Sequence, residues 1–555
     1  MTRRFTIALL AALLLAGAGC SDSAQTNDDA RVTPDGGGDA TPADVGVDAP
    51  APLALGAFYE LDADSSGKIA ASLPVNGDET MMVLLLSLDD QGVVQHDYTV
   101  NSKIAAMRGA PPAPATPAQP SFAAASPWPA PRRCTFAQRL QRLLAEAKGK
   151  KLAPPTYAAA SVPPKVGETR EFKVGSGGGT PVTITAEAIH VDNVAVFWID
   201  KTTTPLATIS SEDLKQLTDE FANIIVPRER VYFGKESDVD GDGLISVLLS
   251  PLVAGSAVAY VSPCDLVNAS SLPGCAASNG MELVYLSPPS SLQPPYNTAR
   301  ALLETVAHEF QHAIYFYRKF VLNQTVGTNE NPYVTEGLSH LAQDLSGYQS
   351  GNLYVLAATL GEIDLVSVPN SVGDKILKYV PGSADGVLRG AGYMLLRYFF
   401  DQAGGDAIDS NGDPQDKGGI AWLRGFMDQP ETGLASLLAS TKMSYADLVT
   451  QYWTAVALSN RVAGGKPVST DPRYNYLPTV TDSVTGRQRG CDLFGATHAG
   501  PIPGPATQDF DTADGKLRPG GAELLVLKVE KAGTLEVEVT TAAQAKARVR
   551  VIRIR

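Results

Sequence analysis

The sequence predicts an α+β fold in which a strand-rich region is followed by one long helix and a mostly helical region, with β-rich segments on both sides. Three observations carry this prediction. Strand-like apolar runs fill much of residues 169–287, apolar residues recur at three-and-four spacing between residues 297 and 459, and strict alternation returns in residues 521–555. The net charge of −14, without a basic cluster, argues against a nucleic-acid partner.

The N-terminal segment has the pattern of a bacterial lipoprotein signal. Arg3 and Arg4 precede an apolar run that is too short to cross a membrane, and small residues follow up to Cys20. We therefore expect residues 1–20 to be a signal peptide and Cys20 to carry a lipid anchor, with simple cleavage nearby as the alternative. The membrane is then a partner, and the expected location is the bacterial outer membrane or cell surface.

Changes in composition divide the rest of the chain. The predicted parts are a disordered acidic tether (21–52), a small β-rich domain (53–108), a Pro/Ala-rich linker (109–135), a short helix and connector (136–161), the main domain (162–515) and a C-terminal β segment (516–555). The helix, at residues 136–151, is basic and amphipathic. The C-terminal segment is short for an independent domain, so completing a sheet with earlier strands is an alternative. The region before residue 162 is either a removable propeptide or an architectural domain.

The main domain begins with two or three strands in residues 169–201, and a helix is expected at 211–225. An acidic loop then places Asp238, Asp240 and Asp242 before Gly243, as in the start of an EF-hand calcium loop. Leu249 stands where a full EF-hand has its bidentate Glu, so calcium would need further ligands from elsewhere. A solvated acidic turn is the alternative. Strands are expected at residues 245–252, 257–263 and 282–287.

The next helix, expected at residues 297–321, contains His308, Glu309 and His312 in the order His-Glu-x-x-His. Residues four apart share a helix face, so both imidazoles can reach one zinc ion while Glu309 acts as general base on a water molecule. With only six His in the chain, this pattern arises by chance in fewer than about one chain in a hundred. We therefore predict one catalytic zinc.

A catalytic zinc needs a third protein ligand. The metzincin continuation, with Gly and a third His, is excluded because Tyr315 and Arg318 occupy those positions. Glu336 is the better candidate, since it lies in a second amphipathic helix predicted at residues 332–345, after enough chain for an antiparallel return.

These residues carry a family resemblance. HEFQH at 308–312, the run Thr-Glu-Gly-Leu-Ser at 335–339 and the upstream stretch at 233–252 are similar to the hyicolysin-type neutral zinc metallopeptidases of the gluzincin clan, over about residues 165–405. The resemblance implies a zincin-like catalytic domain, in which a mixed sheet lies over the His-Glu-x-x-His helix and a mostly helical subdomain follows. It also implies that His308, His312 and Glu336 are the zinc ligands and that Glu309 is the catalytic base. Many gluzincins place an Asp four residues after the third ligand, where this chain has His340. Glu304 is an alternative carboxylate to orient His308.

The gluzincin comparison implies two further roles. A downstream Tyr or His donates a hydrogen bond to the oxyanion, and Tyr393 is our candidate, with Tyr348, Tyr354, Tyr398 and His498 as alternatives. Residues 279–287 partly resemble the aminopeptidase strand in which a Glu binds the free amine of the substrate. Glu282 would be that residue, although Leu283 replaces the expected Asn, and we prefer to interpret Glu282 as a surface residue on a strand.

Cysteine spacing suggests one short disulfide loop. Cys264 and Cys275 are close in sequence, and an exported protein favours their oxidation. A pair between Cys134 and Cys491 follows only by elimination.

The sequence thus predicts an exported, membrane-tethered zinc endopeptidase that acts on proteins or peptides. Two alternatives stay open: an aminopeptidase that uses Glu282, and a non-catalytic surface lipoprotein that binds calcium.

Overall fold

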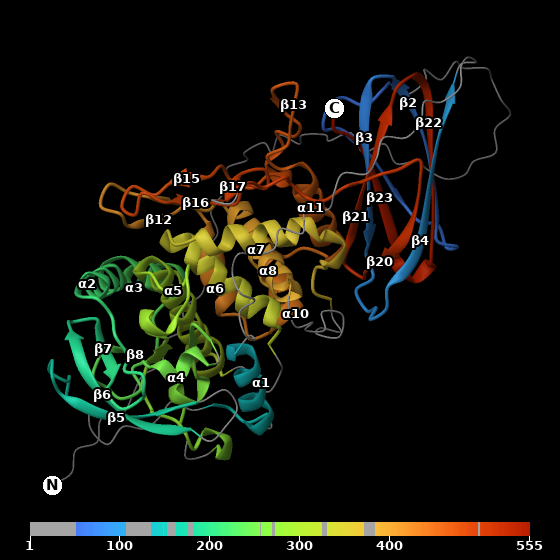
Figure 1. The fold of residues 1–555 in the computed structure, drawn as a ribbon. Coiled ribbons are helices and arrows are strands. Elements are labelled where there is room, and N and C mark those ends of the chain that lie inside the picture. The colour runs from blue at the N-terminus through green and yellow to red at the C-terminus, as the bar shows by residue number, and fades with distance from the viewer. Residues whose placement is uncertain are drawn as a thin grey trace, which may run out of the picture. The chain divides into compact units, whose positions relative to one another are not determined.

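The computed structural model describes residues 51–106, 135–147, 149–152, 162–175, 181–255, 257–268, 272–324, 330–370, 383–497 and 500–555. These residues form several sheets and a helical region, so the mixed α+β class is confirmed (Figure 1). The signal segment with Cys20, most of the tether and most of the Pro/Ala-rich linker lie outside the described residues. Among the helices in these ranges, none combines the length and the apolar composition that a membrane span requires.

A six-stranded sheet forms the N-terminal part of the main domain. Its strands lie in the order β5 (Thr169–Val174), β6 (Val182–Val191), β7 (Ala195–Asp200), β8 (Ile245–Leu249), β10 (Leu283–Leu286) and β9 (Ala259–Val261). β7, β8 and β10 are parallel, and every residue in them is buried, as expected for apolar strands covered on both faces. β9 runs antiparallel to β10 and is an edge strand.

The predicted His-Glu-x-x-His helix is α5 (Ala299–Phe316), which begins at the Thr298 cap and continues as a wider turn over Tyr317–Leu322. It contacts β9, β10 and the next helix, α6 (Pro332–Ser346). α6 begins at the Asn331 cap and ends at Gly347, whose φ of 87° is in the left-handed region that glycine adopts at helix ends. Both helices are buried along nearly their whole length, so their polar residues lie inside the protein.

The mostly helical region predicted after Glu336 contains five α-helices in the described residues. They are α7 (Ser350–Gly361), α8 (Ser383–Gln402), α9 (Gly419–Met427), α10 (Gly433–Thr441) and α11 (Tyr445–Leu458). Before the central helices come α1 (Thr135–Ala147), α2 (Ser211–Glu220) with a wider turn over Phe221–Ile225, α3 (Val226–Phe233) and the one-turn α4 (Pro251–Ala254). One two-stranded ribbon, β11 (Asp406–Ile408) with β12 (Pro414–Asp416), lies between α8 and α9. Three more follow α11: β13 (Val462–Ala463) with β14 (Lys466–Pro467), β15 (Val480–Thr481) with β16 (Gln488–Arg489), and β17 (Ala496–Thr497) with β18 (Gly500–Pro501).

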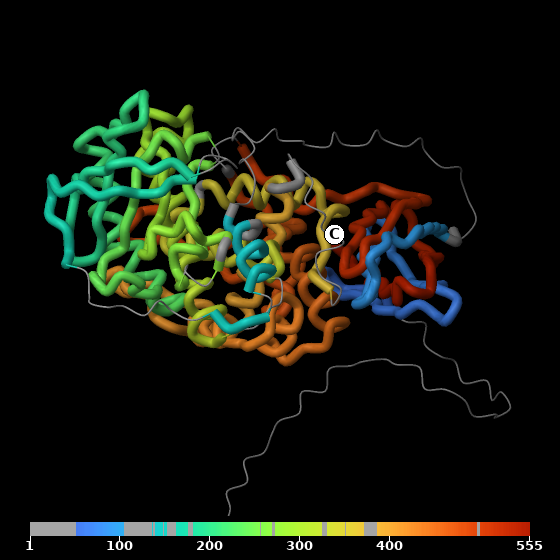
Figure 2. Tube along the Cα trace, turned by 90° about the horizontal axis from the view of Figure 1, so that it is seen from below, coloured from blue at the N-terminus to red at the C-terminus, as the bar shows by residue number. Residues whose placement is uncertain are grey.

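A β-sandwich is built from both ends of the chain. One sheet has the order β1 (Phe58–Asp62), β23 (Ala547–Arg553), β3 (Glu79–Ser87), β21 (Ala522–Val529) and β19 (Gln508–Asp509). The other has β2 (Lys68–Asn76), β22 (Ala532–Thr541), β4 (His96–Ala106) and β20 (Thr512–Leu517). Figure 2 shows the blue N-terminal and red C-terminal strands interleaved. The C-terminal segment therefore completes sheets with the earlier strands.

The sandwich also contacts the helical region. The indole Nε1 of Trp453 donates a hydrogen bond to the carbonyl oxygen of Gly520 at 2.9 Å, and the guanidinium of Arg550 donates to the Thr454 hydroxyl at 2.7 Å. Alternate residues of β3 belong to the same apolar core as the helices, so this face of the sandwich packs against the helical region.

Cys264 and Cys275 form a disulfide with a Cα–Cα distance of 5.1 Å, which closes the loop between β9 and β10. Cys491 is a free, buried thiol, so its predicted pairing is not present. Cys134 lies outside the described residues.

Candidate metal centre

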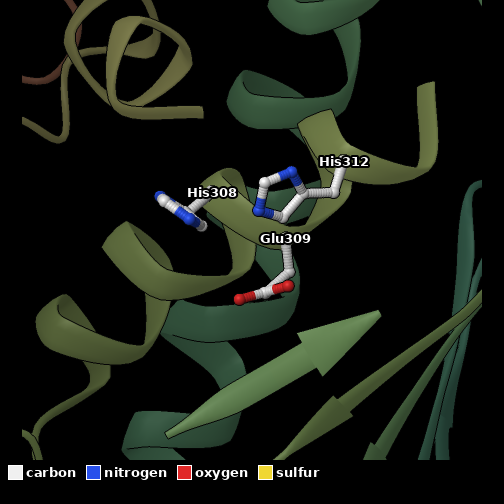
Figure 3. Close-up of side chains that lie close together, drawn as sticks. All are labelled: His308, Glu309 and His312. Atoms are coloured by element: carbon white, nitrogen blue, oxygen red, sulfur yellow. The ribbon is translucent and has the colours of Figure 1, made fainter. Parts of the chain in front are cut away.

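His308, Glu309 and His312 form a buried group on α5. The three residues are 6%, 7% and 1% exposed, and one ligand atom from each lies within 4.8 Å of the others. Figure 3 shows the two imidazole rings on one turn of the helix, with the Glu309 carboxylate pointing toward a neighbouring strand. The described structure thus brings together three residues that could hold a metal ion.

Glu336 comes to this group from α6. Its carboxylate lies 3.3 Å from Nε2 of His308 and 3.7 Å from Nε2 of His312, and the residue is 2% exposed. The two imidazole nitrogens and the carboxylate therefore point toward one small volume. The role of Glu336 as third ligand stays a prediction that this geometry supports.

Hydrogen bonds at the other ring nitrogens leave both Nε2 atoms available. The Gln343 amide donates to the backbone oxygen of Glu304 at 2.9 Å, which turns its oxygen toward Nδ1 of His308 at 3.4 Å. The Ser339 hydroxyl donates to the Gln311 side-chain oxygen at 2.7 Å. It lies 3.0 Å from Nδ1 of His312 and 3.4 Å from Nε2, so we assign its accepted hydrogen bond to the nearer Nδ1.

With a proton on each Nδ1, each Nε2 presents a lone pair toward Glu336. Burial also lowers the pKa of His312 well below its usual value and keeps the ring neutral, as a ligand must be. Two neutral imidazoles and one carboxylate form the donor set of a catalytic zinc site, so these residues fit that ion.

Arg389 holds Glu336 in its charged form. Its guanidinium lies 3.0 Å from the Glu336 carboxylate. Burial raises the pKa of Glu336, but Arg389 and the two imidazoles outweigh that effect and bring the pKa well below its ordinary value. A close crossing of α6 and α8 makes this contact possible: a Cβ on Gly337 would lie 2.6 Å from the carbonyl carbon of Gly392, so only glycine fits there.

Glu309 faces the edge strand. Its carboxylate accepts a hydrogen bond from the backbone N–H of Val261 in β9 at 3.1 Å. Burial raises the pKa of Glu309, and the Glu336 carboxylate adds to the effect, while His308 and Arg389 oppose it. A raised pKa suits a general base that must accept a proton near neutral pH.

The Glu304 carboxylate, which we proposed to orient His308, binds the backbone of α7. The Glu304 carboxylate accepts from the backbone N–H of Gly351 at 3.2 Å, and Gln343 takes the position beside His308 instead. His340 stacks edge-on against His308 with ring centroids 4.8 Å apart, and its Nδ1 donates to the side-chain oxygen of Asn352 at 2.7 Å.

The candidate oxyanion donors have other partners. The Tyr393 hydroxyl donates a hydrogen bond to Asp344 at 2.9 Å. Among the described residues, the structure shows no hydrogen bond from Tyr393 to His308, Glu309 or His312. Tyr348 donates to Glu220 at 2.6 Å, and Tyr398 to the backbone oxygen of Arg473 at 2.7 Å. The assignment of Tyr393 stays a prediction that these contacts do not support, and His498 lies outside the described residues.

The acidic loop forms a second group of possible ligands. One carboxylate oxygen from each of Asp238, Asp240 and Asp242 lies within 4.8 Å of the others. Burial raises the pKa of Asp240 to about 6, and the charge of Asp242 adds to this, although Arg170 lies 3.7 Å from Asp240. The three carboxylates are closer together than their mutual repulsion favours, and a cation would relieve it.

Glu282 is buried, so our interpretation of it as a surface residue is wrong. It is 3% exposed, and its carboxylate accepts from the Ser237 hydroxyl and from the Val239 backbone N–H at 2.8 Å. These bonds anchor the start of the acidic loop and account for the burial of a carboxyl group whose pKa is raised to about 7, chiefly by burial. They also occupy the oxygens that would bind a free substrate amine.

A scan against protein-family models finds no family that matches this chain, and a search of curated proteins finds no match either. The structure shows a buried His308–Glu309–His312 group on a long helix, consistent with a His-Glu-x-x-His metal site.

Proposed function

We propose that the protein is a zinc-dependent endopeptidase that resembles the hyicolysin-type gluzincins. The observation that carries the proposal is the convergence of Nε2 of His308, Nε2 of His312 and the Glu336 carboxylate beside Glu309. A purely structural zinc site is usually closed by four protein ligands and needs no general base. A neighbouring carboxylate with a raised pKa favours catalysis instead.

Each residue then has a defined task. A zinc ion held by His308, His312 and Glu336 would supply Lewis-acid activation of the scissile carbonyl and of a water molecule. Glu309 would accept a proton from that water as it attacks, and would pass the proton to the leaving amine. The water thus adds across the peptide bond, and no covalent intermediate with the protein forms.

The protein's location belongs to the same proposal. The lipoprotein-like signal and Cys20 support export and attachment to a bacterial outer membrane or cell surface, where protein or peptide substrates would be met. Of the two alternatives, the aminopeptidase is disfavoured because Glu282 is bonded to the acidic loop. The non-catalytic lipoprotein is separated from the peptidase by experiment.

The test compares the wild-type mature chain with Glu309→Gln and with Glu304→Gln. Glu304 is the matched control: it lies five residues before Glu309 on α5, and its carboxylate accepts a hydrogen bond from the backbone N–H of Gly351. We expect all three proteins to bind about one zinc, and only Glu309→Gln to lose hydrolysis of an unstructured protein, by roughly a thousandfold or more. Equal hydrolysis by wild type and Glu309→Gln, or no zinc bound by any form, would refute the proposal.

A further inference from the structure

Helix α1 packs beside the candidate metal centre. Its apolar residues lie on one face and enter the main core, as a set of Phe136, Leu140, Leu143, Leu144 and Ala147. The helix contacts the disulfide-closed loop, the edge strand β9 and helix α6. On the loop, the Glu146 carboxylate accepts from the backbone N–H of Gly274 at 2.8 Å.

The first turn of α1 covers a predicted zinc ligand. The Phe136 ring stacks on the His312 imidazole with centroids 4.1 Å apart and planes 8° from parallel. Both side chains are 1% exposed. One face of His312 is thus closed by a side chain from a segment more than 150 residues earlier in the chain.

One turn later, α1 contacts the edge strand. The Arg139 guanidinium lies 3.6 Å above the ring of Tyr260 in β9, a cation–π contact. Tyr260 stacks on Tyr285 with centroids 4.3 Å apart, and the Tyr285 hydroxyl donates to the buried Asp265 at 2.8 Å. Aromatic faces backed by a carboxylate form a site that attracts a cation.

Both contacts lie next to the reacting groups. Val261, which follows Tyr260, donates its backbone N–H to Glu309, and His312 is a predicted ligand. An edge strand is where an extended peptide would add its backbone to the sheet. A peptide aligned on β9 toward Glu309 would therefore meet the face that α1 covers.

We propose that α1 occupies the substrate face of the centre and competes with substrate within the same chain. Its two anchors also mark the side chains that this face accepts: a large aromatic side chain against His312 and a basic side chain over Tyr260. The substrate class is then peptides that carry an aromatic and a basic residue close together. This inference rests on the proposed peptidase function for its catalytic part, whereas occupancy of the face can be measured without catalysis.

The binding test uses full mature chains that all carry Glu309→Gln, so that nothing is cleaved. The probe is a fluorescein-labelled peptide copy of residues 135–147. We expect it to bind at least tenfold more tightly when Phe136→Ala and Arg139→Glu weaken the internal helix, because the competitor present at high effective concentration is then lost. Arg142→Glu, an exposed position on the same helix, should behave like the parent. Equal affinity in all chains would overturn the inference.

A second variant tests whether the change in probe binding comes only from misfolding of the double variant. Arg139 is only partly buried, so Arg139→Glu alone leaves no core cavity and should shift probe binding in the same direction by several-fold. Its thermal unfolding should match that of Arg142→Glu. Unchanged probe binding by a folded Arg139→Glu chain would count against a cation site over Tyr260.

The activity test restores Glu309. The Phe136→Ala/Arg139→Glu chain should show kcat/KM raised at least tenfold, and should prefer a peptide containing Phe and Arg over the same peptide with both replaced by Ala. No preference would overturn the substrate class. Absence of hydrolysis in every chain, together with the expected probe binding, would refute the peptidase proposal and leave the position of α1 standing.

Discussion

The two imidazoles of the candidate centre are oriented by neutral side chains. His308 faces the Gln343 amide and His312 faces the Ser339 hydroxyl. Neutral acceptors fix the ring and its tautomer, but they push less electron density onto the metal-binding nitrogen than a carboxylate would. The ionised Glu336, held by Arg389, supplies the negative charge in this site.

Loss of the Gln343 amide should weaken zinc binding. Gln343→Ala frees the His308 ring to rotate and to change tautomer, so we expect zinc affinity to fall about 10- to 100-fold. Competition with a chromogenic chelator measures this. Gln402→Ala, an exposed amide on α8, is the control and should retain wild-type affinity. If both variants bind zinc equally well, Gln343 does not orient the ligand.

The sequence could indicate only part of this centre. His308, Glu309 and His312 are local on one helix, and Glu336 needed only a second helix that returns. Gln343 and Ser339 lie on the same helix as Glu336, but amides and hydroxyls are common on helices and do not mark a metal site. Arg389 reaches Glu336 only because α6 and α8 cross at two glycines, and sequence spacing carries no signal for that crossing.

Glu523 should make stability fall between mildly acidic and neutral pH. Burial raises its pKa to about 7 in the folded protein, the Asp364 carboxylate adds to this, and Tyr98 opposes it. The unfolded chain releases this proton near pH 4.5, so stability falls as pH rises from there to about 7 and stays level above. Glu523→Gln should raise the free energy of unfolding by on the order of 2 kcal/mol at pH 8 and change it little at pH 4.

Urea unfolding at the two pH values measures the difference. Glu536→Gln, at an exposed position of β22, controls for simple loss of charge and should show no such contrast. An equal effect of Glu523→Gln at both pH values would mean that the carboxyl group is not held neutral by its surroundings.

The sequence predicted the type of each helix and strand better than its boundaries or its burial. The helix around His308 ends its regular hydrogen bonding at Phe316 and continues as a wider turn, where the prediction ran on to residue 321. The strand prediction 282–287 was correct, yet Glu282 was placed at the surface. A short, wholly apolar run such as Leu283–Leu286 gives no alternation from which to read which neighbours are buried.

The acidic loop should bind calcium if its three carboxylates are ligands. We expect millimolar calcium to raise the melting temperature by about 1 °C for each 1 kcal/mol of binding free energy, because binding to the folded state alone stabilises it. Asp240→Asn should abolish the shift, while Asp409→Asn, in another acidic turn, should leave it intact. A calcium shift that survives Asp240→Asn would place the ion elsewhere.

At the scale of the whole chain, the sequence predicted the strands of the sandwich but not their pairing. Alternation marked strands at both ends, and it allowed the C-terminal segment either to stand apart or to join earlier strands. Partners such as Leu73 and Leu535 are hundreds of residues apart, and no local pattern records their register. The antiparallel pairing of β2 with β22, and of β3 with β21 and β23, shows one interleaved structure.

The interleaving predicts that a chain cut between the sandwich strands and α1 stays together. A specific protease site placed within residues 109–133 would yield two fragments, and β22 would still pair with β2 and β4. We expect the fragments to elute together in size-exclusion chromatography and to separate only in denaturant. Separation in native buffer would show that the paired strands are not stable without the covalent connection.

A cut within residues 109–133 would therefore leave the two parts of the protein bound to each other. β1 to β4 pair with the last strands of the chain in both sheets of the sandwich. The N-terminal fragment would therefore remain bound as a subunit after cleavage. An anchor attached at Cys20 would then keep holding a two-chain protein. If Cys20 carries a lipid, a cut in the linker would free the chain end before α1 but would not release the protein from the membrane.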